Sequence, residues 1–499
     1  MAKRTTIIDI GSNSMTLVIY EKSSRFAFHL IEKVRSSVRI GEHAYEEGGR
    51  LTPEAMDRAF YTLEDFVQIA RSYKSQKIFC VATSALRDAP NRSDFLARVR
   101  RKLKLNIRVI DGNKEAYFGA LAALNLLPPF REAVTVDIGG GSTELAKIVD
   151  GRIVDTISLP IGTVRLKELF FDKKRGFKEA GAYVEEVLED LPDRFRSEMV
   201  IGIGGTIRAL SKAIMRSQAY PIDTLHAFAY DYPEYEKFIK KVAKASVLEL
   251  KDFPISSSRY DTIREGSTIF YRINKRFQTR QVLTSKAGVR EGVYLHDILR
   301  NSNFRFPHNF NVSIKSLLDR YALLPRHCSH SQRICKTIYQ AVHAQFDSDR
   351  AYLAPLLMAA KLLLIFNRLN IYSNSDYSFF FLLENLNFTL SHREKLLIAV
   401  LLRYSQRGKV DNGIYKRYAA LLPPLEDLKW LTFILSVTEA LIRNKMLCSV
   451  EATFDGKVLA IESARELFLA KEAIKKVKKP EPFAVILEKN GDSEGGCHA

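Results

Sequence analysis

Cysteine is scarce in this chain. The 499 residues include five cysteines, an odd number without paired spacing: Cys80, Cys328, Cys335, Cys448 and Cys497. This pattern argues against the disulfide framework that holds many small secreted domains together. We therefore expect reduced, intracellular thiols.

Long apolar runs are also missing. The most apolar stretch, Leu353 to Phe366, is interrupted by Pro355 and Lys361 and is shorter than the roughly 20 residues that a membrane-spanning helix needs. The N-terminus begins Met-Ala-Lys-Arg and has neither the apolar core nor the cleavage site of a signal peptide. We expect a cytoplasmic protein without membrane insertion, in which this stretch forms a buried helix.

Acidic residues are outnumbered. The chain has 76 Lys+Arg against 57 Asp+Glu, a formal charge of +19. Such a charge favours a polyanionic partner, which leaves nucleic acid, an anionic membrane surface and a phosphate polymer open. Basic clusters at 98–104, 173–178 and 272–280 would suit a polyanion, although charged helix faces are commonly only solvated.

One short pattern occurs twice. An apolar β-branched run ends at Asp137 and is followed by glycines, hydroxyl residues and Glu144, and a near-copy ends at Asp9, 128 residues earlier. Each copy reads as a strand, a tight loop and a returning strand. The pattern predicts one α/β fold used twice, with the two loops facing each other across a cleft.

The loops have the composition of a phosphate site. Glycine lets the backbone turn sharply, so that several N–H groups point toward one anion. Carboxylates beside such a loop suit Mg²⁺, which prefers oxygen ligands and retains water. We expect phosphate binding by Gly11, Ser12, Asn13 and Ser14 and by Gly139, Gly140, Gly141, Ser142 and Thr143, and Mg²⁺ binding by Asp9, Asp137 and Glu144.

A third glycine loop follows the strand that ends at Ile203. It reads Gly204-Gly205-Thr206 and opens a helix. It contacts the ligand, or it only brings that helix close to the strand; the residues alone leave both readings open.

Together these three loops resemble the exopolyphosphatase/guanosine pentaphosphate phosphatase family, which belongs to the superfamily of actin-like proteins, sugar kinases and heat-shock ATPases. The resemblance covers about residues 5–300. It implies two RNase H-like (actin-like ATPase) domains around a cleft and hydrolysis of the terminal phosphate of inorganic polyphosphate or of pppGpp, which gives ppGpp. It also implies a homodimer. We do not expect nucleic acid as a partner.

Glu115 separates a hydrolase from a kinase within this resemblance. On the residues alone, Glu115 is better explained as a charge that stabilises a helix N-terminus without catalysis, where the helix dipole should keep it ionised. The family places its catalytic glutamate in a Gly-x-x-Glu-Ala element, which Gly112 to Ala116 match. The resemblance therefore makes Glu115 the base that activates water and Arg87 a phosphate-binding catalytic arginine, rather than a surface ion pair.

Four segments are predicted. Residues 1–125 form domain I and 126–300 form domain II, both RNase H-like; 301–446 form an all-α domain, and 447–499 a small α+β unit. The helical domain resembles an HD-type phosphohydrolase, but residues 359–366, where its His-Asp pair is expected, contain no metal ligands. We expect no metal site there, and no zinc site at His327, Cys328, His330 and Cys335.

The sequence thus favours an Mg²⁺-dependent exopolyphosphatase that also hydrolyses pppGpp. Two alternatives stay open: a kinase-type phosphotransferase of the same superfamily, and a non-catalytic sensor of alarmone or polyphosphate.

Overall fold

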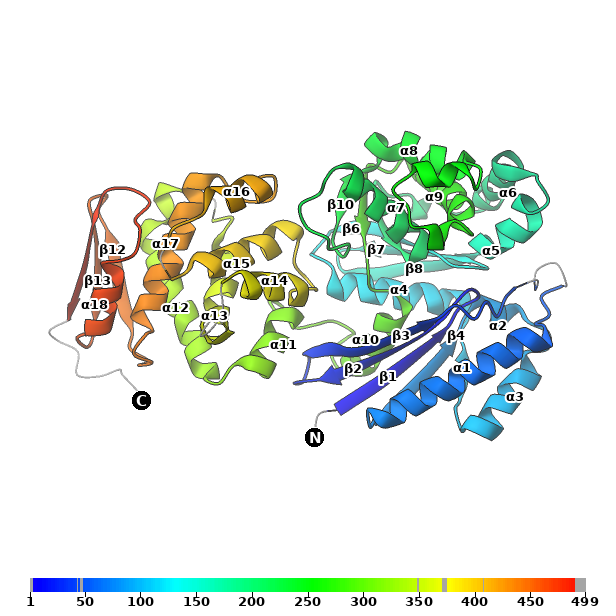
Figure 1. Cartoon of the computed structure of the whole chain (residues 1–499), viewed down its shortest axis with the longest axis horizontal. Coiled ribbons are helices and arrows are strands. Elements are labelled where there is room, and N and C mark those ends of the chain that lie inside the picture. The colour runs from blue at the N-terminus through cyan, green and yellow to red at the C-terminus, as the bar shows by residue number, and fades with distance from the viewer. Residues whose placement is uncertain are drawn as a thin grey trace. The chain divides into compact units, whose positions relative to one another are not determined.

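The structure is a computed structural model. It describes residues 3–42, 44, 48–347, 350–369, 375–406 and 408–489. Its contacts divide the chain into two compact units, Met1–Phe310 and Asn311–Ala499, and each is described by itself (Figure 1).

The first unit begins with a five-stranded sheet in the order β3-β2-β1-β4-β5. Strands β1 and β2 form an antiparallel hairpin that β3 extends, whereas β4 and β5 run parallel to β1. Helix α1 starts as predicted, because the Thr52 hydroxyl accepts a bond from Ala55 N and proline occupies the first turn. The elements are β1 (Lys3–Ile10), β2 (Met15–Lys22), β3 (Phe28–Ser36), α1 (Pro53–Ser72), β4 (Lys77–Ala82), α2 (Ser84–Asp88), α3 (Arg92–Leu103) and β5 (Ile107–Val109).

The second sheet repeats this topology. Its order is β10-β11-β9-β6-β7-β8, so β6 takes the place of β1 and the hairpin partner β7 that of β2. The register matches too, since Asp9 pairs with Thr16 and Asp137 with Glu144. The predicted repeat is therefore present. The strands are β6 (Glu132–Ile138), β7 (Thr143–Val149), β8 (Arg152–Leu159), β9 (Met199–Ile203), β10 (Ala229–Asp231) and β11 (Gln281–Thr284).

Further helices pack on the second sheet and bury its apolar core, which Val136, Leu210 and Phe270 share. Helix α9 is buried on all sides over 265–271, and Ile269, Phe270 and Phe277 of this helix belong to the core. These helices are α5 (Thr163–Leu166), α6 (Gly176–Glu189), α7 (Gly204–Ser217), α8 (Tyr232–Lys244) and α9 (Ile263–Phe277).

Two helices join the halves. Helix α4 (Gly112–Leu126) follows the first sheet in the chain but packs against β7 and β8 of the second, and α10 (Val289–Leu299) follows the second sheet but contacts β1. The two helices also pack on each other, and a Cβ added to Gly292 of α10 would lie 2.0 Å from the carbonyl oxygen of Phe118 in α4. The backbones therefore meet where only glycine fits.

The predicted boundary between domains I and II, at 125/126, stays a prediction.

The second unit is helical and then α+β. Strands β12 and β13 form the predicted hairpin, in which Gly456 has φ +93° and Asp455 Oδ1 accepts bonds from Lys457 N and Val458 N. The elements are α11 (Val312–Tyr321), α12 (Pro325–Val342), α13 (Leu353–Leu369), α14 (Ser375–Asn385), α15 (His392–Tyr404), α16 (Asn412–Tyr418), α17 (Leu425–Leu441), β12 (Val450–Phe454), β13 (Val458–Ser463), α18 (Phe468–Ile474) and β14 (Ala484–Lys489).

The expected HD-like character of this unit stays a prediction. His327 Nε2 lies 2.8 Å from the carbonyl oxygen of Lys445, and burial lowers the pKa of His330. The stretch 359–366 lies within helix α13, as the sequence predicts. Helices α12 and α15 pack against α13. Residues 490–499 of the predicted C-terminal unit lie outside the described residues.

The cysteines divide into two kinds. Cys80, Cys328 and Cys335 are free and buried, as the sequence predicts. Cys448, in contrast, is disulfide-bonded, so the expectation of reduced thiols is wrong for it; spacing along the chain does not show which cysteines meet in space. Cys497 lies outside the described residues.

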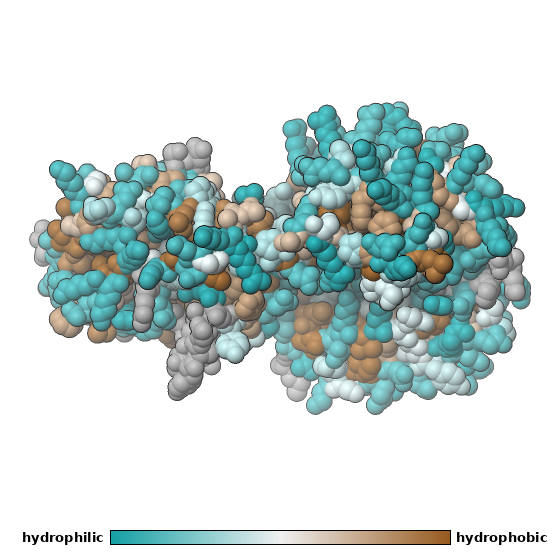
Figure 2. All heavy atoms as spheres, turned by 45° about the horizontal axis from the view of Figure 1, so that its top comes forward, coloured by the Kyte–Doolittle hydropathy of each residue, from teal (hydrophilic) through white to brown (hydrophobic). Residues whose placement is uncertain are grey.

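The structure agrees with the lack of long apolar runs in the sequence. No helix in the described part of the chain is both long and apolar enough to cross a membrane. Figure 2 shows hydrophilic side chains over most of the face in view, with apolar side chains in separate patches.

The crossing of α4 and α10 predicts a contrast between two glycines. Gly292→Ala should destabilise the fold by about 1–3 kcal/mol, because backbone atoms must move to admit the methyl group. Gly119→Ala in α4 is the control: its Cβ would lie 3.4 Å from Ile203 Cδ1, an ordinary contact, and alanine favours a helix. Thermal unfolding of the full chain measures both, and equal effects would contradict this account of the crossing.

Candidate functional site

The first two glycine loops touch each other. A Cβ added to Gly140 would lie 2.7 Å from Ser12 Cβ, and the Ser12 hydroxyl is 2.9 Å from that of Ser84. Both loops close in the same way, since Gly11 N donates to Ser14 O and Gly139 N to Ser142 O. The structure thus places the predicted phosphate loops face to face.

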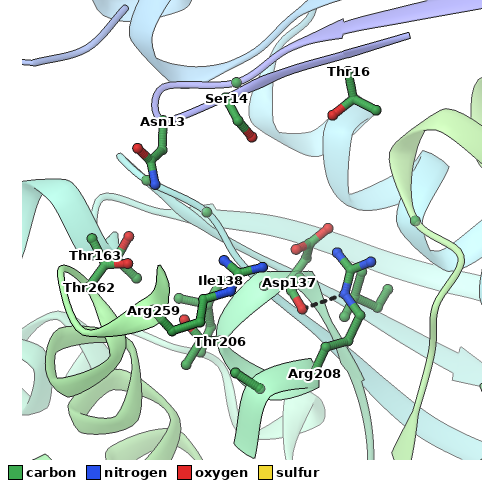
Figure 3. Close-up of a pocket in the computed structure, with 18 of the residues that line it drawn as sticks. Asn13, Ser14, Thr16, Asp137, Ile138, Thr163, Thr206, Arg208, Arg259 and Thr262 are labelled. Carbon is green, nitrogen blue, oxygen red and sulfur yellow. Dashed lines mark hydrogen bonds between the residues drawn. The ribbon is translucent and has the colours of Figure 1, made fainter. Parts of the chain in front are cut away.

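The third loop closes against the second aspartate. Gly204 has φ +85°, and a Cβ there would lie 2.7 Å from Asp137 Oδ1. A side chain would therefore be strained by the backbone and would strike the carboxylate. Behind Gly204, the Nε atom of Arg208 donates to the Gly204 carbonyl at 2.7 Å, the dashed line in Figure 3.

Glu115 lies at the start of α4, close to the loops. The helix is capped by Asp111, whose side chain accepts from Lys114 N, and Gly112 packs so closely on Ser158 of β8 that no Cβ would fit. This packing leaves Glu115 only 8% exposed. The Nη1 atom of Arg87 donates to Glu115 Oε2 at 2.8 Å.

Burial reverses the expectation that the helix terminus keeps Glu115 ionised. Burial, with the nearby charge of Glu144, raises the pKa of Glu115 well above its usual value, although Arg87 acts in the other direction. The sequence shows the helix position of Glu115 but not how completely the second half covers it. A carboxyl group with a raised pKa is a stronger base once ionised.

The three predicted metal ligands are buried as well. Burial raises the pKa of Asp9, that of Asp137 to about 6 and that of Glu144 to about 7. Repulsion adds to burial, because Asp137 raises the pKa of both Glu115 and Glu144. These carboxyl groups therefore form one acidic cluster whose ionisation a nearby cation would favour.

This cluster fits Mg²⁺ better than a metal held by protein ligands alone. Within the described ranges, no three His, Cys, Asp or Glu side chains lie close enough together to hold a metal ion. Mg²⁺ is commonly bound by one or two carboxylates together with waters and substrate phosphates. Glu144 Oε2 is buried and has no hydrogen-bond donor among the residues described, so this oxygen is available to a cation or its water.

Arg87 links the acidic cluster to the second loop. Its Nη2 atom donates to the Ser142 hydroxyl at 3.1 Å and lies 4.0 Å from Glu144 Oε1. The other oxygen partner of Nη1 is the Ile110 carbonyl, at 3.3 Å. The guanidinium is therefore held in place by both halves of the unit before any ligand binds.

A cavity of about 590 Å³ opens in front of the loops. In Figure 3, Asn13, Ser14 and Thr16 lie on one side of it and Asp137, Arg208 and Arg259 on the other. Of the predicted site residues, its lining includes Asp9, Gly11, Ser12, Asn13, Ser14, Glu115, Asp137, Gly139, Gly140, Gly204, Gly205 and Thr206.

The other predicted residues lie behind this lining. Arg87 and Ser142 border a second cavity, Gly141 and Glu144 are not among the lining residues of the first, and Thr143 is fully buried. The Thr143 hydroxyl donates to the carbonyl oxygen of Ile161 at 2.6 Å. Its side chain thus supports the loop from below, and the expected contact of the Thr143 backbone N–H with phosphate stays a prediction.

Sequence reasoning missed most of the cations in the first cavity. The clearest set lies on α7, where Arg208, Lys212 and Arg216 follow each other at four-residue spacing and therefore share one helix face. That spacing, directly after the third glycine loop, was a usable signal. The remaining basic lining residues are Lys33, Arg35, Arg259, Lys286 and Arg290.

These cations crowd one another. Burial and the charge of Arg290 lower the pKa of Arg208 to about 10, and burial, Arg290 and Arg208 lower that of Lys33 to about 8. Arg290 lies 3.7 Å from Asp9 Oδ2, the one ion pair that joins a lining cation to Asp9 or Asp137 in the described part of the chain. The cavity therefore has unused positive charge, which suits a multiply charged anion.

The comparisons with known proteins agree with this geometry. The model of the Ppx/GppA phosphatase family matches residues 18–301. The chain is 30% identical over 299 residues to a bifunctional 3-dehydroquinate synthase/phosphatase of Fusobacterium nucleatum; the match covers 56% of this chain and 44% of that protein, so the chain spans less than half the length of this relative.

Solved structures are similar to the first unit. The crystal structure of the Aquifex aeolicus member of the Ppx/GppA family is 28% identical, with a TM-score of 0.52, and covers 60% of this chain and 99% of its own. An exopolyphosphatase from Cytophaga hutchinsonii is 23% identical, with a TM-score of 0.54, over 61% and 100% of the two chains; this likeness concerns the fold alone.

The buried charge of Glu115 predicts a gain in stability when it is removed. Because its pKa is raised from 4.5 in the folded state, stability should fall as the pH rises from about 4.5 to that raised pKa. In metal-free buffer, Glu115→Gln should therefore unfold at a temperature several degrees higher than the wild type at pH 8 and at about the same temperature at pH 4. A melting temperature unchanged or lowered at pH 8 would contradict the assigned electrostatics.

Proposed function

The chain belongs to the Ppx/GppA phosphatase family, and we propose that it removes the terminal phosphate of inorganic polyphosphate. The observation that carries this proposal is the Arg87–Glu115 pair, at 2.8 Å, beside two facing phosphate loops. A buried carboxylate next to a phosphate site suits the activation of a water molecule. A kinase would direct such a carboxylate at the hydroxyl of an acceptor substrate instead of at water.

Different residues of the site carry out different parts of the proposed reaction. The N–H groups of the first two loops bind the terminal phosphoryl oxygens, and Arg87 neutralises charge that develops on them. Glu115 orients a water molecule and accepts its proton as the water oxygen attacks the terminal phosphorus. The bridging P–O bond then breaks, which gives orthophosphate and a chain shorter by one phosphate.

Mg²⁺ is part of the proposal. Asp9, Asp137 and Glu144 would hold it, directly or through water, and when bound it supplies positive charge to the phosphate oxygens. Its presence would also favour the ionised form of the buried acids, Glu115 included.

The cations on α7 support a long substrate. Arg208, Lys212 and Arg216 are about 6 Å apart along the helix axis, since each residue rises about 1.5 Å. The row begins at the third loop and ends at the exposed Arg216. A linear polyanion whose end lies between the first two loops can follow it outward.

We propose pppGpp as a second substrate, because its 5′-triphosphate presents the same terminal group to the loops. The nucleoside would then occupy the part of the cavity where Leu225 and Pro254 supply apolar surface.

The homodimer that the resemblance implies stays a prediction.

The role of Glu115 is tested directly by Glu115→Ala. We expect release of phosphate from polyphosphate, measured with malachite green in the presence of Mg²⁺, to fall by at least about 10³-fold, while polyphosphate still binds. The control is Glu54→Ala, which removes another glutamate from the first turn of a helix and should leave the rate unchanged.

The outcomes of this test separate the alternatives. Turnover like that of the wild type in Glu115→Ala would overturn the assignment of the base. Wild-type protein that binds polyphosphate without releasing phosphate, with or without Mg²⁺, would indicate a sensor. ATP consumption that requires a cosubstrate would indicate a kinase.

The row on α7 predicts a dependence on chain length. Lys212→Ala/Arg216→Ala should raise KM about tenfold or more for long-chain polyphosphate and change it less than about twofold for tripolyphosphate, which is too short to reach both positions. Arg326→Ala/Lys336→Ala on α12 removes the same two charges from exposed positions of the other unit and is the control. Equal effects on all substrates would contradict a track for the chain.

A further inference from the structure

Arg290 is a buried cation that lacks hydrogen-bond acceptors. It lies in the first turn of α10 and lines the first cavity, and its side chain is only 14% exposed. Its Nε atom is buried and has no acceptor among the described residues. The carboxylate that its Nη1 atom approaches, that of Asp9, is 3.7 Å away, beyond hydrogen-bond distance. A buried guanidinium without acceptors is costly, and a ligand oxygen in the cavity would satisfy it.

The protein anchors the helix turn that carries this side chain. The next residue, Glu291, accepts hydrogen bonds from Gly288 N at 2.8 Å and from the Tyr20 hydroxyl at 2.6 Å. Each oxygen of Glu291 thus has a donor other than Arg290. Tyr20 lies on β2, and its ring centroid is 4.6 Å from that of Tyr294 on α10. These contacts fix the start of α10 against the first sheet, so Arg290 lines the cavity from an anchored position.

Arg87 differs from Arg290 in this respect. Arg87 donates to Glu115 at 2.8 Å and to Ser142 at 3.1 Å, so part of its donor set is already engaged. It borders the second cavity and is not among the lining residues of the first. Arg87 is therefore held beside the proposed base, whereas Arg290 presents its donors to the first cavity itself.

Arg290 also stands where the chain would leave the terminal phosphate. A Cβ added to Gly288 would lie 3.9 Å from Asp137 Oδ2, and one added to Gly204 would lie 2.7 Å from Asp137 Oδ1, so α10 and α7 both begin beside this carboxylate. Arg208 of α7 starts the row of cations that the proposed substrate follows, and the charge of Arg290 helps to lower the pKa of Arg208. The two guanidinium groups thus share one part of the cavity, where the second phosphate of the chain would enter the row.

This position bears on the bond that breaks. As the water oxygen bonds to the terminal phosphorus, the electron pair of the bridging P–O bond passes to the bridging oxygen, which becomes a terminal oxygen of the shortened chain. Negative charge therefore develops on the leaving phosphate. An N–H donor directed at that oxygen binds it more strongly in the transition state than in the ground state.

We propose that Arg290 is a second catalytic arginine, which donates hydrogen bonds to the leaving phosphate of the polyphosphate chain and neutralises the charge that develops on it. Arg87 acts on the terminal phosphoryl group, so the two arginines serve opposite sides of the bond that breaks. This proposal rests on the proposed function, because the direction of the chain decides which phosphate Arg290 meets.

Kinetics of full-length Arg290→Ala with tripolyphosphate and Mg²⁺ test this role. We expect kcat to fall at least about 10²-fold and KM to change less than about fivefold, because the lost interaction is strongest in the transition state. Millimolar guanidinium chloride should raise the kcat of this variant about tenfold, whereas sodium chloride at the same concentration should not. Recovery of kcat by added Mg²⁺ alone would show that Arg290 only balances Asp9, and would overturn the proposal.

Arg290→Lys separates this role from folding. Lysine keeps a positive charge near Asp9, so the variant should unfold at about the temperature of the wild type. Its ammonium group lacks the planar fork of donors, and we therefore expect kcat still to fall about tenfold or more. A kcat like that of the wild type would contradict a directed contact with the leaving phosphate.

Arg272→Ala is the matched control. Arg272 is also 14% exposed and also has a buried Nε atom without an acceptor in the described structure, but it pairs with Glu185 and does not line the first cavity. We expect its kcat to stay within about twofold of the wild-type value. Equal losses in Arg272→Ala and Arg290→Ala would assign the effect to the loss of any buried arginine and overturn the proposal.

Binding to a variant without the base gives a result independent of turnover. In full-length Glu115→Gln with Mg²⁺, adding Arg290→Ala should weaken binding of tripolyphosphate about tenfold and of orthophosphate less than about twofold, measured by isothermal titration, because orthophosphate fills only the terminal position. Equal weakening of both would overturn the contact and leave the proposed function intact. Absence of phosphate release by the wild type would overturn the proposed function, and the titration would still report whether Arg290 contacts a second phosphate.

Discussion

The first unit depends on how it accommodates buried negative charge. Asp9, Asp137, Glu144 and Glu115 come from both halves, and burial raises the pKa of each; for Asp137, Glu144 and Glu115 the charge of another acid of this set raises the pKa further. Such a cluster is unfavourable for folding unless cations or protons compensate it. Arg87 is a compensating charge that the chain itself provides, and it contacts both Glu115 and the second loop. The remaining negative charge would favour a divalent cation at this site.

The basic residues of the cavity complete this balance at longer range. Burial, together with the charges of neighbouring cations, lowers the pKa of Lys33 and of Arg208. Arg87 pairs with Glu115, and Arg290 lies 3.7 Å from Asp9, so the protein neutralises the acidic groups only in part. A phosphate chain that carries a metal ion would suit this mixture of acids and cations.

Much of this site was predictable from sequence because its parts are local. Strand, glycine loop and carboxylate follow one another within eleven residues at 134–144, and the repetition at Asp9 predicted that the two loops meet. The raised pKa of Glu115 was not predictable, since it depends on burial and on the charge of Glu144 from the other half. The inward turn of Thr143 depends on strand register, and the bonding of Cys448 on a contact in space, and neither is encoded in spacing along the chain.

The crossing of α4 and α10 also limits how the first unit can move. Gly292 and Phe118 touch through their backbones, with no side chain between them that could adapt by changing rotamer. Sliding of one helix along the other is therefore blocked, whereas rotation about the contact changes few distances. This contact therefore restrains sliding of the two helices more than rotation about the contact. Glu115 lies within one turn of α4 from Phe118 and thus stands beside this restrained crossing.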